Sequence, residues 1–255
     1  MHYLLKGVQV LFQPGYRKFI LVPIVANVLF FIALSIFMVG LFSDTMSWFM
    51  GFIPSWLEFM SYFLWVVFVL VFLIAYGFSF TMITNLFAAP FNGFLAEKIQ
   101  RDLGQDVPEV SIAEMIVRSV KREIQKLIYF VWYGLLVMLG LFILSFVPLL
   151  NLMAPVIAFM WAAWCMAIQY MDYPADNNLQ EFKQLRSDAK KPWVHTYGFG
   201  GLTSLLVMVP VVNIFVMPVA VAGGTLLWLS KIHQPESEFD LDDVAEPAQI
   251  EHKDS

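Results

Sequence analysis

Apolar residues run through this chain in long stretches that short polar segments separate. Residues 19–42 contain no charged side chain, and a second uncharged run covers residues 59–93. Roughly 20 residues of helix cross the hydrocarbon core of a bilayer, so the first run predicts a transmembrane helix. The second run is longer than one crossing requires, and it predicts a helix that crosses and then continues beyond the membrane.

Four further apolar segments form two pairs, and each pair is broken by prolines around an asparagine. The first pair covers residues 127–147 and 148–171, and the second covers residues 195–209 and 210–231. The breaks carry Pro148, Asn151 and Pro155 in the first pair and Pro210, Asn213 and Pro218 in the second. Proline cannot continue a helix through its own position without losing a hydrogen bond. Each pair therefore predicts a helical hairpin.

Length alone leaves open whether these hairpins cross the membrane. Residues 195–209 would measure about 22 Å as a helix, against a hydrocarbon core of about 30 Å. Because this segment falls short of a crossing, we favour two hairpins that penetrate the membrane only partway.

An amphipathic basic helix is predicted between the second and third apolar runs. Ser111 and Glu114 have the spacing of a capping box at its start. Apolar residues recur at helical spacing on one face, and the other face carries Arg118, Lys121, Arg122, Glu123 and Lys126. The pattern by itself favours a helix lying on anionic headgroups. The alternative is that these charges shape the entrance of an anion pore.

Composition agrees with a membrane protein and excludes an ordinary soluble domain. Hydrophobic residues make up 60% of the chain, charged residues 14%, and the mean hydropathy is +0.72. The predicted fold is all-α and integral to the membrane, with two long transmembrane helices, two Pro-broken, hemi-penetrating hairpins and the amphipathic helix. We expect one helical membrane domain over residues 1–231 and an acidic, disordered tail over residues 232–255.

The basic residues predict the orientation of the chain. All 15 Lys and Arg lie near the N-terminus, between the second and third runs, between the fourth and fifth, or after the sixth. The connection over residues 43–58 and both proline breaks have none. By the positive-inside rule the basic side is cytoplasmic, with both termini inside. Insertion in both orientations would be an exception to this rule.

The motifs of common enzyme classes are absent from the sequence. There is no Walker A sequence, no H-E-x-x-H and no G-x-S-x-G. The four histidines have no metal-ligand spacing. We therefore expect no enzyme activity, cofactor, metal or nucleic-acid partner.

Matched Pro-interrupted segments point instead to a solute path. No charged residue lies deep within an apolar run, which argues against a proton relay and favours a passive route. A membrane scaffold that binds other proteins and transports nothing is the alternative function.

Residues 14–18 are the candidate anion site. Pro14 and Gly15 predict a turn directly before the first apolar run, where the following helix has free amide groups and the positive end of its dipole. Arg17 and Lys18 add two cations, so the turn suits a compact dianion such as sulfate. We call Gly15, Tyr16, Arg17 and Lys18 the glycine–cation turn. The alternative is that both cations only anchor the first helix at the membrane surface.

Several strings resemble the CysZ sulfate permease family of bacterial inner membranes. They are P-G-Y-R-K, N-L-F-A-A-P-F-N-G-F-L-A-E-K-I, S-V-K-R-E-I-Q-K-L, M-D-Y-P-A-D-N-N, G-F-G-G-L-T-S-L and V-P-V-V-N, which occur in that order between residues 14 and 213. The resemblance implies sulfate entry into the cytoplasm for cysteine synthesis. It also implies homo-oligomers in the lipid bilayer, and it leaves protomers of opposed orientation open.

The resemblance further implies a sulfate site at the glycine–cation turn. Because it includes S-V-K-R-E-I-Q-K-L, it also favours the interpretation in which Arg118, Lys121, Arg122 and Glu123 shape the pore entrance. At the turn the chain departs from the G-L-R-R form of the family. Tyr16 stands in place of Leu, and Lys18 stands in place of a second Arg. Lysine supplies charge but not the bidentate fork of arginine.

Overall fold

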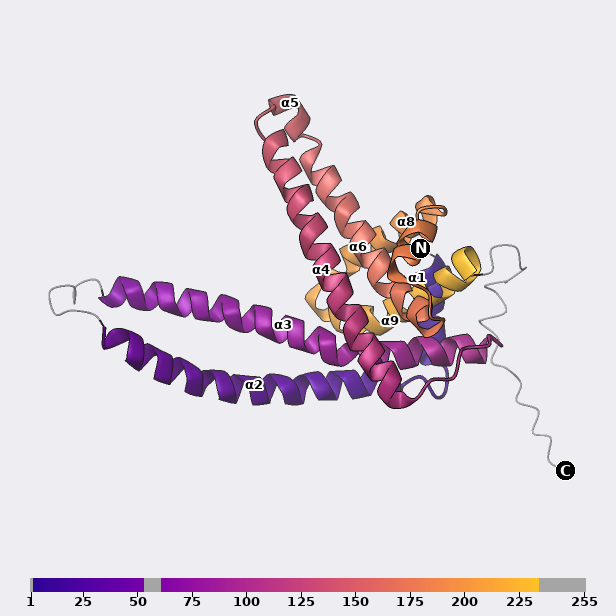
Figure 1. The fold of residues 1–255 in the computed structure, drawn as a ribbon, viewed down its shortest axis with the longest axis horizontal. Coiled ribbons are helices and arrows are strands. Elements are labelled where there is room, and N and C mark those ends of the chain that lie inside the picture. Colours follow the sequence, from indigo (N-terminus) through magenta and orange to yellow (C-terminus); the bar gives the residue numbers. More distant parts are fainter. Residues whose placement is uncertain (1, 53–60, 234–255) are drawn as a thin grey trace. The chain divides into compact units, whose positions relative to one another are not determined.

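The computed structural model describes residues 2–52 and 61–233, and this part of the chain is helical apart from turns (Figure 1). The predicted all-α class is confirmed. In chain order the elements are α1 (His2–Phe12), α2 (Lys18–Met50), α3 (Ser61–Asp102), α4 (Ile112–Leu144), α5 (Pro148–Asn151), α6 (Ala154–Asn177), α7 (Phe182–Asp188), α8 (Trp193–Val207), α9 (Pro210–Trp228) and the π-helical turn η2 (Leu229–His233).

Five helical stretches among the described residues are long and apolar enough to cross a membrane. They are Val28–Phe49, Tyr62–Phe80, Ile112–Leu144, Leu149–Asn177 and Phe215–His233. The predicted disordered tail begins at residue 232, whereas the structure places residues 232 and 233 in the helical turn η2. The rest of the predicted tail, from residue 234, lies outside the described residues.

Two predicted boundaries differ from the structure. The connection expected at residues 43–58 is helical as far as Met50, and residues 53–60 lie outside the described part. The amphipathic helix is not a separate element, because α4 joins it to the third apolar run without a break. No Gly or Pro occurs between Ser111 and Gly134 to interrupt that helix. The predicted cap is confirmed, since Ser111 Oγ accepts a hydrogen bond from the Glu114 amide at 3.2 Å.

Prolines open the helices at both predicted breaks. Pro148 begins α5, Pro155 lies in the first turn of α6, and Pro210 begins α9, where a missing N–H costs nothing. Pro218 does not end a helix but lies inside α9. The side chains of Pro148, Pro210 and Asn213 lie outside the described part.

The chain divides into two compact units, one of residues 1–21 with 89–255 and one of residues 22–88. The extent of the predicted membrane domain, residues 1–231, stays a prediction. The unit of residues 22–88 contains most of α2 and the first part of α3. Their contacts are largely aromatic, and Phe42 lies 5.1 Å from Phe72 between ring centroids. Their outer faces expose large apolar side chains, as lipid-facing helices do.

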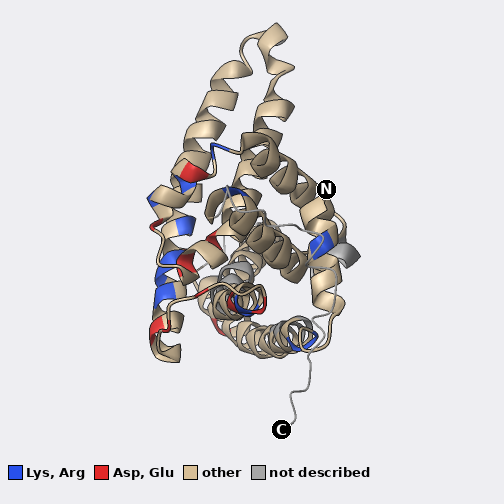
Figure 2. Cartoon of the chain, turned by 90° about the vertical axis from the view of Figure 1, so that its right-hand side faces the viewer, with Lys and Arg blue, Asp and Glu red and all other residues tan. Residues whose placement is uncertain are grey.

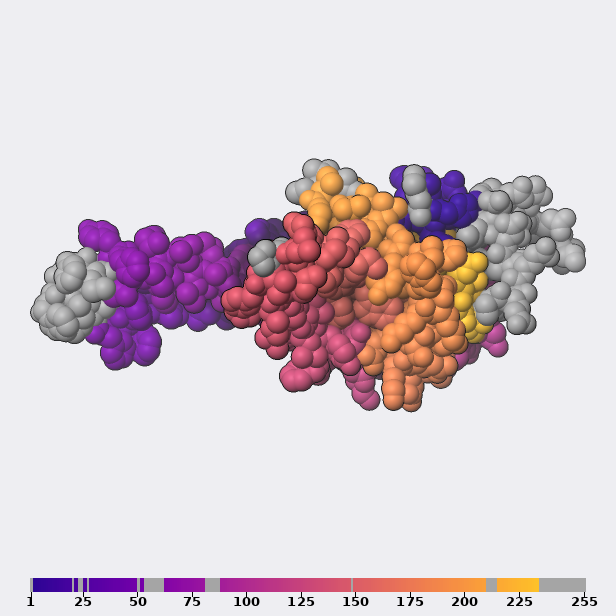
Figure 3. All heavy atoms as spheres, turned by 90° about the horizontal axis from the view of Figure 1, so that it is seen from above, coloured from indigo at the N-terminus to yellow at the C-terminus, as the bar shows by residue number. Residues whose placement is uncertain are grey.

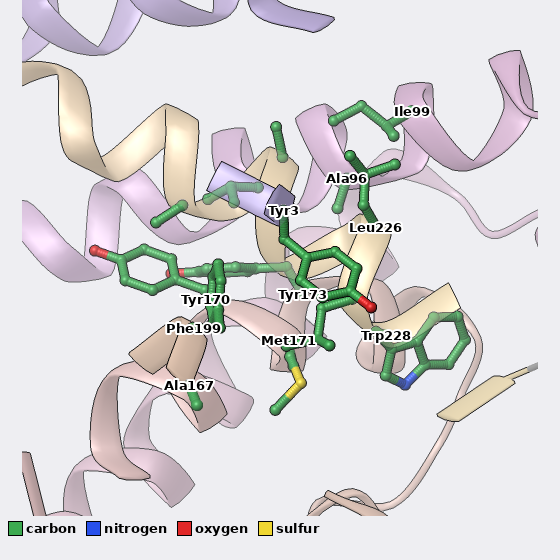
Figure 4. Close-up of a cluster of buried hydrophobic side chains, with 14 of the residues drawn as sticks. Tyr3, Ala96, Ile99, Ala167, Tyr170, Met171, Tyr173, Phe199, Leu226 and Trp228 are labelled. Carbon is green, nitrogen blue, oxygen red and sulfur yellow. The ribbon is translucent and has the colours of Figure 1, made fainter. Parts of the chain in front are cut away.

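The other unit has a hydrophobic core built from α1, α6, α8, α9 and the end of α3 (Figure 4). Helix α1 packs along α9, and the two lie side by side in Figures 1 and 3. Helix α8 packs closely on α6 at Gly200, where a Cβ would lie 1.9 Å from the Ala163 carbonyl oxygen.

Candidate functional site

The glycine–cation turn connects α1 to α2. Gly15 has φ of +93°, a backbone conformation that glycine adopts without the strain a side chain would bring. The Tyr16 amide donates to the Gln13 carbonyl at 3.3 Å, and the Phe19 amide donates to the Tyr16 carbonyl at 2.9 Å. Helix α2 then begins at Lys18. The side chains of Arg17 and Lys18 are exposed, so the predicted turn forms and its two cations face outward.

Tyr16 ties this turn to the end of α3. Its side chain is buried, and its hydroxyl donates a hydrogen bond to the Asp102 carboxylate. Burial and the Asp102 carboxylate together hold the pKa of Tyr16 well above its usual value. The Lys98 ammonium also donates to Asp102, at 2.8 Å, and lies 4.8 Å from the centroid of the Tyr16 ring.

The same contacts bring a third cation to the turn. Lys98 Cε lies 3.8 Å from the position that a Cβ on Gly15 would occupy. The Lys98 side chain is 32% exposed, so its ammonium remains accessible beside Gly15. Sequence reasoning missed Lys98 because it lies 80 or more residues from the turn.

A second polar feature, the ionic cluster, lies between α4 and α6. Its members are Arg118, Arg122, Glu123, Lys126, Asp172 and Asp176. Arg118 Nε lies 3.3 Å from Asp176 Oδ2, and Arg122 Nε lies 2.8 Å from Asp172 Oδ1. The two helices run antiparallel, and residues four apart on one helix pair with residues four apart on the other.

Lys126 is the most enclosed cation of the ionic cluster, with 3% of its side chain exposed. Its ammonium pairs with Glu123 and lies 3.4 Å from Asp172 Oδ2. It also lies 4.4 Å from the centroid of the Tyr173 ring. Three cations are thus matched by three carboxylates, which is how charges persist inside a protein.

Neutral polar groups complete the surroundings of the ionic cluster. Glu123 Oε1 accepts from the Gln169 amide at 3.0 Å, and the Tyr173 hydroxyl accepts from the Asn92 amide at 3.1 Å. The cluster encloses a cavity of about 10 Å³. That volume is close to what one water needs, and it cannot hold a sulfate ion. The Arg118 Nη1 and Nη2 atoms are buried without a hydrogen-bond partner among the described residues.

Helix α4 places its polar face inward and its apolar face outward. Ile112 and Val117 are each 68% exposed, whereas Arg122 and Lys126 are buried. In a membrane this is the expected arrangement, because ionisable groups turn towards the protein and apolar groups towards lipid. Figure 2 shows charged residues along the lower part of α4 and none at the hairpin tip around α5. Arg122 contacts protein, since its guanidinium donates to Asp172 and to the Gln180 carbonyl, each at 2.8 Å.

The structure brings three of the four predicted entrance residues together. Arg118, Arg122 and Glu123 belong to the ionic cluster, while Lys121 is exposed on the surface. Sequence reasoning missed their carboxylate partners on α6. A signal was present, since Asp172 and Asp176 have the same four-residue spacing as the cations of α4.

Comparison with known proteins gives one family and relatives that share one name. The family described as sulfate transporter CysZ/etoposide-induced protein 2.4 matches residues 3–218. The sulfate transporter CysZ of Pseudomonas fluorescens (strain Pf0-1) is 42% identical over 236 residues, which cover 89% of this chain and 91% of that protein. The sulfate transporter CysZ of Pectobacterium atrosepticum is 37% identical over 236 residues, 91% of this chain and 84% of that protein. The family match includes both the glycine–cation turn and the ionic cluster.

Proposed function

Because the chain belongs to the sulfate transporter CysZ/etoposide-induced protein 2.4 family, we propose that it carries sulfate across the bacterial inner membrane for assimilation into cysteine. It is a multi-pass membrane protein, as its five apolar helices and its relatives support. The relatives are named as transporters, which fits a protein that is not an enzyme. Transport is passive in this proposal, because nothing in the sequence supplies an energy source.

The glycine–cation turn is the sulfate-binding site in this proposal. The observation that supports it is the left-handed Gly15 directly before α2, with Lys98 Cε 3.8 Å from its Cβ position and with Arg17 and Lys18 exposed next to it in the chain. The first amides of a helix lack partners within the helix and attract anions. With no side chain on Gly15, an oxyanion can approach the backbone closely. Tyr16 contributes to this site by positioning the turn, because its hydroxyl donates to Asp102.

The ionic cluster is the proposed route from the site inward. It is neutral in the described state, so a dianion passes only where a cation exchanges its carboxylate for the anion. Arg118 suits this step, because two of its nitrogen atoms have no partner among the described residues. Sulfate would occupy those donors while Asp176 moves away.

Orientation and assembly follow from the charges and the family. The basic side faces the cytoplasm, with both termini inside. The two Pro-broken hairpins enter the bilayer without crossing it. The protein functions as a homo-oligomer, and opposed protomers remain an alternative arrangement.

Uptake of labelled sulfate into liposomes, together with equilibrium sulfate binding, tests the proposal. The double variant Arg17→Ala/Lys18→Ala removes two charged donors, so we expect sulfate affinity to fall at least tenfold. Arg118→Gln should slow uptake while leaving affinity unchanged, because it acts after binding. Lys183→Ala is the control, since this lysine is exposed and belongs to neither of the two sites.

Two results would contradict the proposal. If liposomes that contain the wild-type protein take up no more sulfate than liposomes without protein, the result would favour a membrane scaffold that transports nothing. Unchanged affinity in a folded Arg17→Ala/Lys18→Ala protein would reduce the pair to a membrane anchor.

A further inference from the structure

A cavity of about 400 Å³ lies between α4, α6 and α8, apart from the two sites already described. Its size is within the range of small-molecule sites. Its lining is mostly aromatic, with one cation: Tyr129, Met160, Trp161, Trp164, Lys190, Trp193 and Tyr197. An aromatic lining with a single lysine is typical neither of a packed core nor of a sulfate path.

The aromatic rings are held in place by contacts among themselves. Trp164 is buried, and its indole N–H donates to the Tyr129 hydroxyl at 3.0 Å. The Trp164 and Tyr197 ring centroids lie 5.9 Å apart, and those of Tyr129 and Trp161 lie 6.2 Å apart. Rings from three helices thus surround the cavity in a fixed arrangement. The faces of aromatic rings attract ammonium groups.

Lys190 provides the complementary positive charge. It lies in the turn between α7 and α8, and its side chain is exposed at the rim of the cavity. The nearby Asp188 carboxylate is engaged elsewhere, with the Lys191 ammonium at 2.9 Å and the Gln180 amide at 3.0 Å. A lysine ammonium is a compact point charge suited to a phosphate oxygen.

The cavity lies where the chain changes from charged to apolar. Lys126 is the last charged residue of α4, and Tyr129 follows it by one helical turn. Trp193 follows Lys191 closely at the start of α8. Trp and Tyr in such positions mark the headgroup level of a bilayer. Beyond Met160, towards the hairpin tip, Val156 is 52% exposed and offers an apolar path for an acyl chain.

We propose that this cavity binds the headgroup of a zwitterionic phospholipid. The lipid phosphate pairs with Lys190, its ammonium lies against the faces of Trp161 and Trp164, and its acyl chains follow the exposed side of α6. This inference concerns lipid recognition and does not depend on sulfate transport. It therefore stands or fails independently of the proposed function.

Calorimetric titration of the full-length protein in maltoside micelles tests this proposal. The ligand is dihexanoylphosphatidylcholine, kept below its own critical micelle concentration. We expect saturable binding to one site per chain. Lys190→Gln and Trp161→Leu should each weaken it about tenfold. Matched controls are Lys183→Gln, which alters an exposed lysine of α7 outside the cavity, and Trp132→Leu, which alters an exposed tryptophan of α4 outside the cavity. Both should bind as wild type does.

Ligand variants identify the group that is recognised. Dihexanoylphosphatidylglycerol keeps the phosphate and the chains but lacks the ammonium, and we expect it to bind about tenfold more weakly. Equal binding of both lipids would indicate a plain phosphate site and overturn the proposal. Free phosphocholine binding as tightly as the lipid would indicate a soluble ligand instead. Absence of saturable binding would also overturn it. Lys190→Gln, at an exposed position, keeps the test valid if Trp161→Leu fails to fold.

Discussion

At the scale of single residues, Tyr16 explains how the glycine–cation turn is attached to α3. A leucine at this position could only pack, whereas the tyrosine also donates to Asp102 on α3. The Asp102 carboxylate in turn holds Lys98 beside Gly15. The Tyr16 side chain thus connects the glycine–cation turn to α3. The shared partner Asp102 positions the Lys98 ammonium beside that turn.

Replacing Tyr16 by Phe tests that connection. The ring and its packing remain, but Asp102 loses a donor, so we expect a loss of about 1 kcal/mol in stability and a lower melting temperature in detergent. The loss should shrink above about pH 10, where tyrosine ionises in the unfolded chain. Because the pKa of Tyr16 is raised in the folded state, the unfolded state binds fewer protons there, and wild-type stability falls as pH rises.

The exposed Tyr62 provides the control, since Tyr62→Phe should change neither the melting temperature nor its pH dependence. Identical melting curves for wild type and Tyr16→Phe from pH 8 to 11 would show that the hydroxyl contributes nothing.

At the scale of helices, glycine determines how closely α8 approaches α6. A Cβ at Gly200 would lie 1.9 Å from the Ala163 carbonyl oxygen, whereas one at Gly198 would meet nothing within 4 Å. The two glycines occur two residues apart on the same helix, yet only one lies in the contact. Comparing alanine substitutions at Gly200 and Gly198 therefore separates the effect of helix packing on stability from the effect of helix propensity.

Gly200→Ala should force α8 away from α6 and lower stability by about 1–3 kcal/mol. Gly198→Ala should leave the packing intact and be neutral or stabilising by up to about 1 kcal/mol. Melting temperatures of the two purified variants, compared with wild type, measure both effects. Equal destabilisation by both substitutions would contradict the close contact.

At the scale of the whole molecule, the tip of the α4–α6 hairpin tests the proposal that this hairpin enters the membrane without crossing it. Its tip is apolar, and Leu149 and Leu152 are 79% and 73% exposed. Such a surface requires lipid or another protomer around it. The hairpin helices are long enough to cross, so length does not decide between a crossing and a partial entry.

Cysteine labelling in proteoliposomes distinguishes a hairpin that crosses the membrane from one that enters it partway. In a Cys165→Ser background, Asn151→Cys should react slowly with impermeant thiol reagents on either side, because a tip within the bilayer or the assembly is shielded from water. Glu109→Cys, at an exposed position between α3 and α4 and outside the candidate membrane spans, should react rapidly from one side. If Asn151→Cys reacts as fast as Glu109→Cys, the hairpin crosses the membrane and ends in an ordinary exposed loop.

The sequence by itself determined the helices and several of their ends. Uncharged runs of sufficient length, the Ser111 cap and the prolines at Pro148 and Pro210 act through local backbone physics, so they can be read from neighbouring residues. The same holds for the glycine–cation turn, whose left-handed residue is Gly15. These features depend on interactions within a few residues.

Tertiary structure alone decided which residues meet. Arg122 pairs with Asp172 across 50 positions, and Lys98 reaches Gly15 from the far end of α3. The amphipathic pattern of α4 defined two faces but not which one is buried, since water would bury the apolar face and a membrane buries the charged one. Only packing against α6 selects the charged face, because its carboxylates offset the cost of enclosing Arg122 and Lys126.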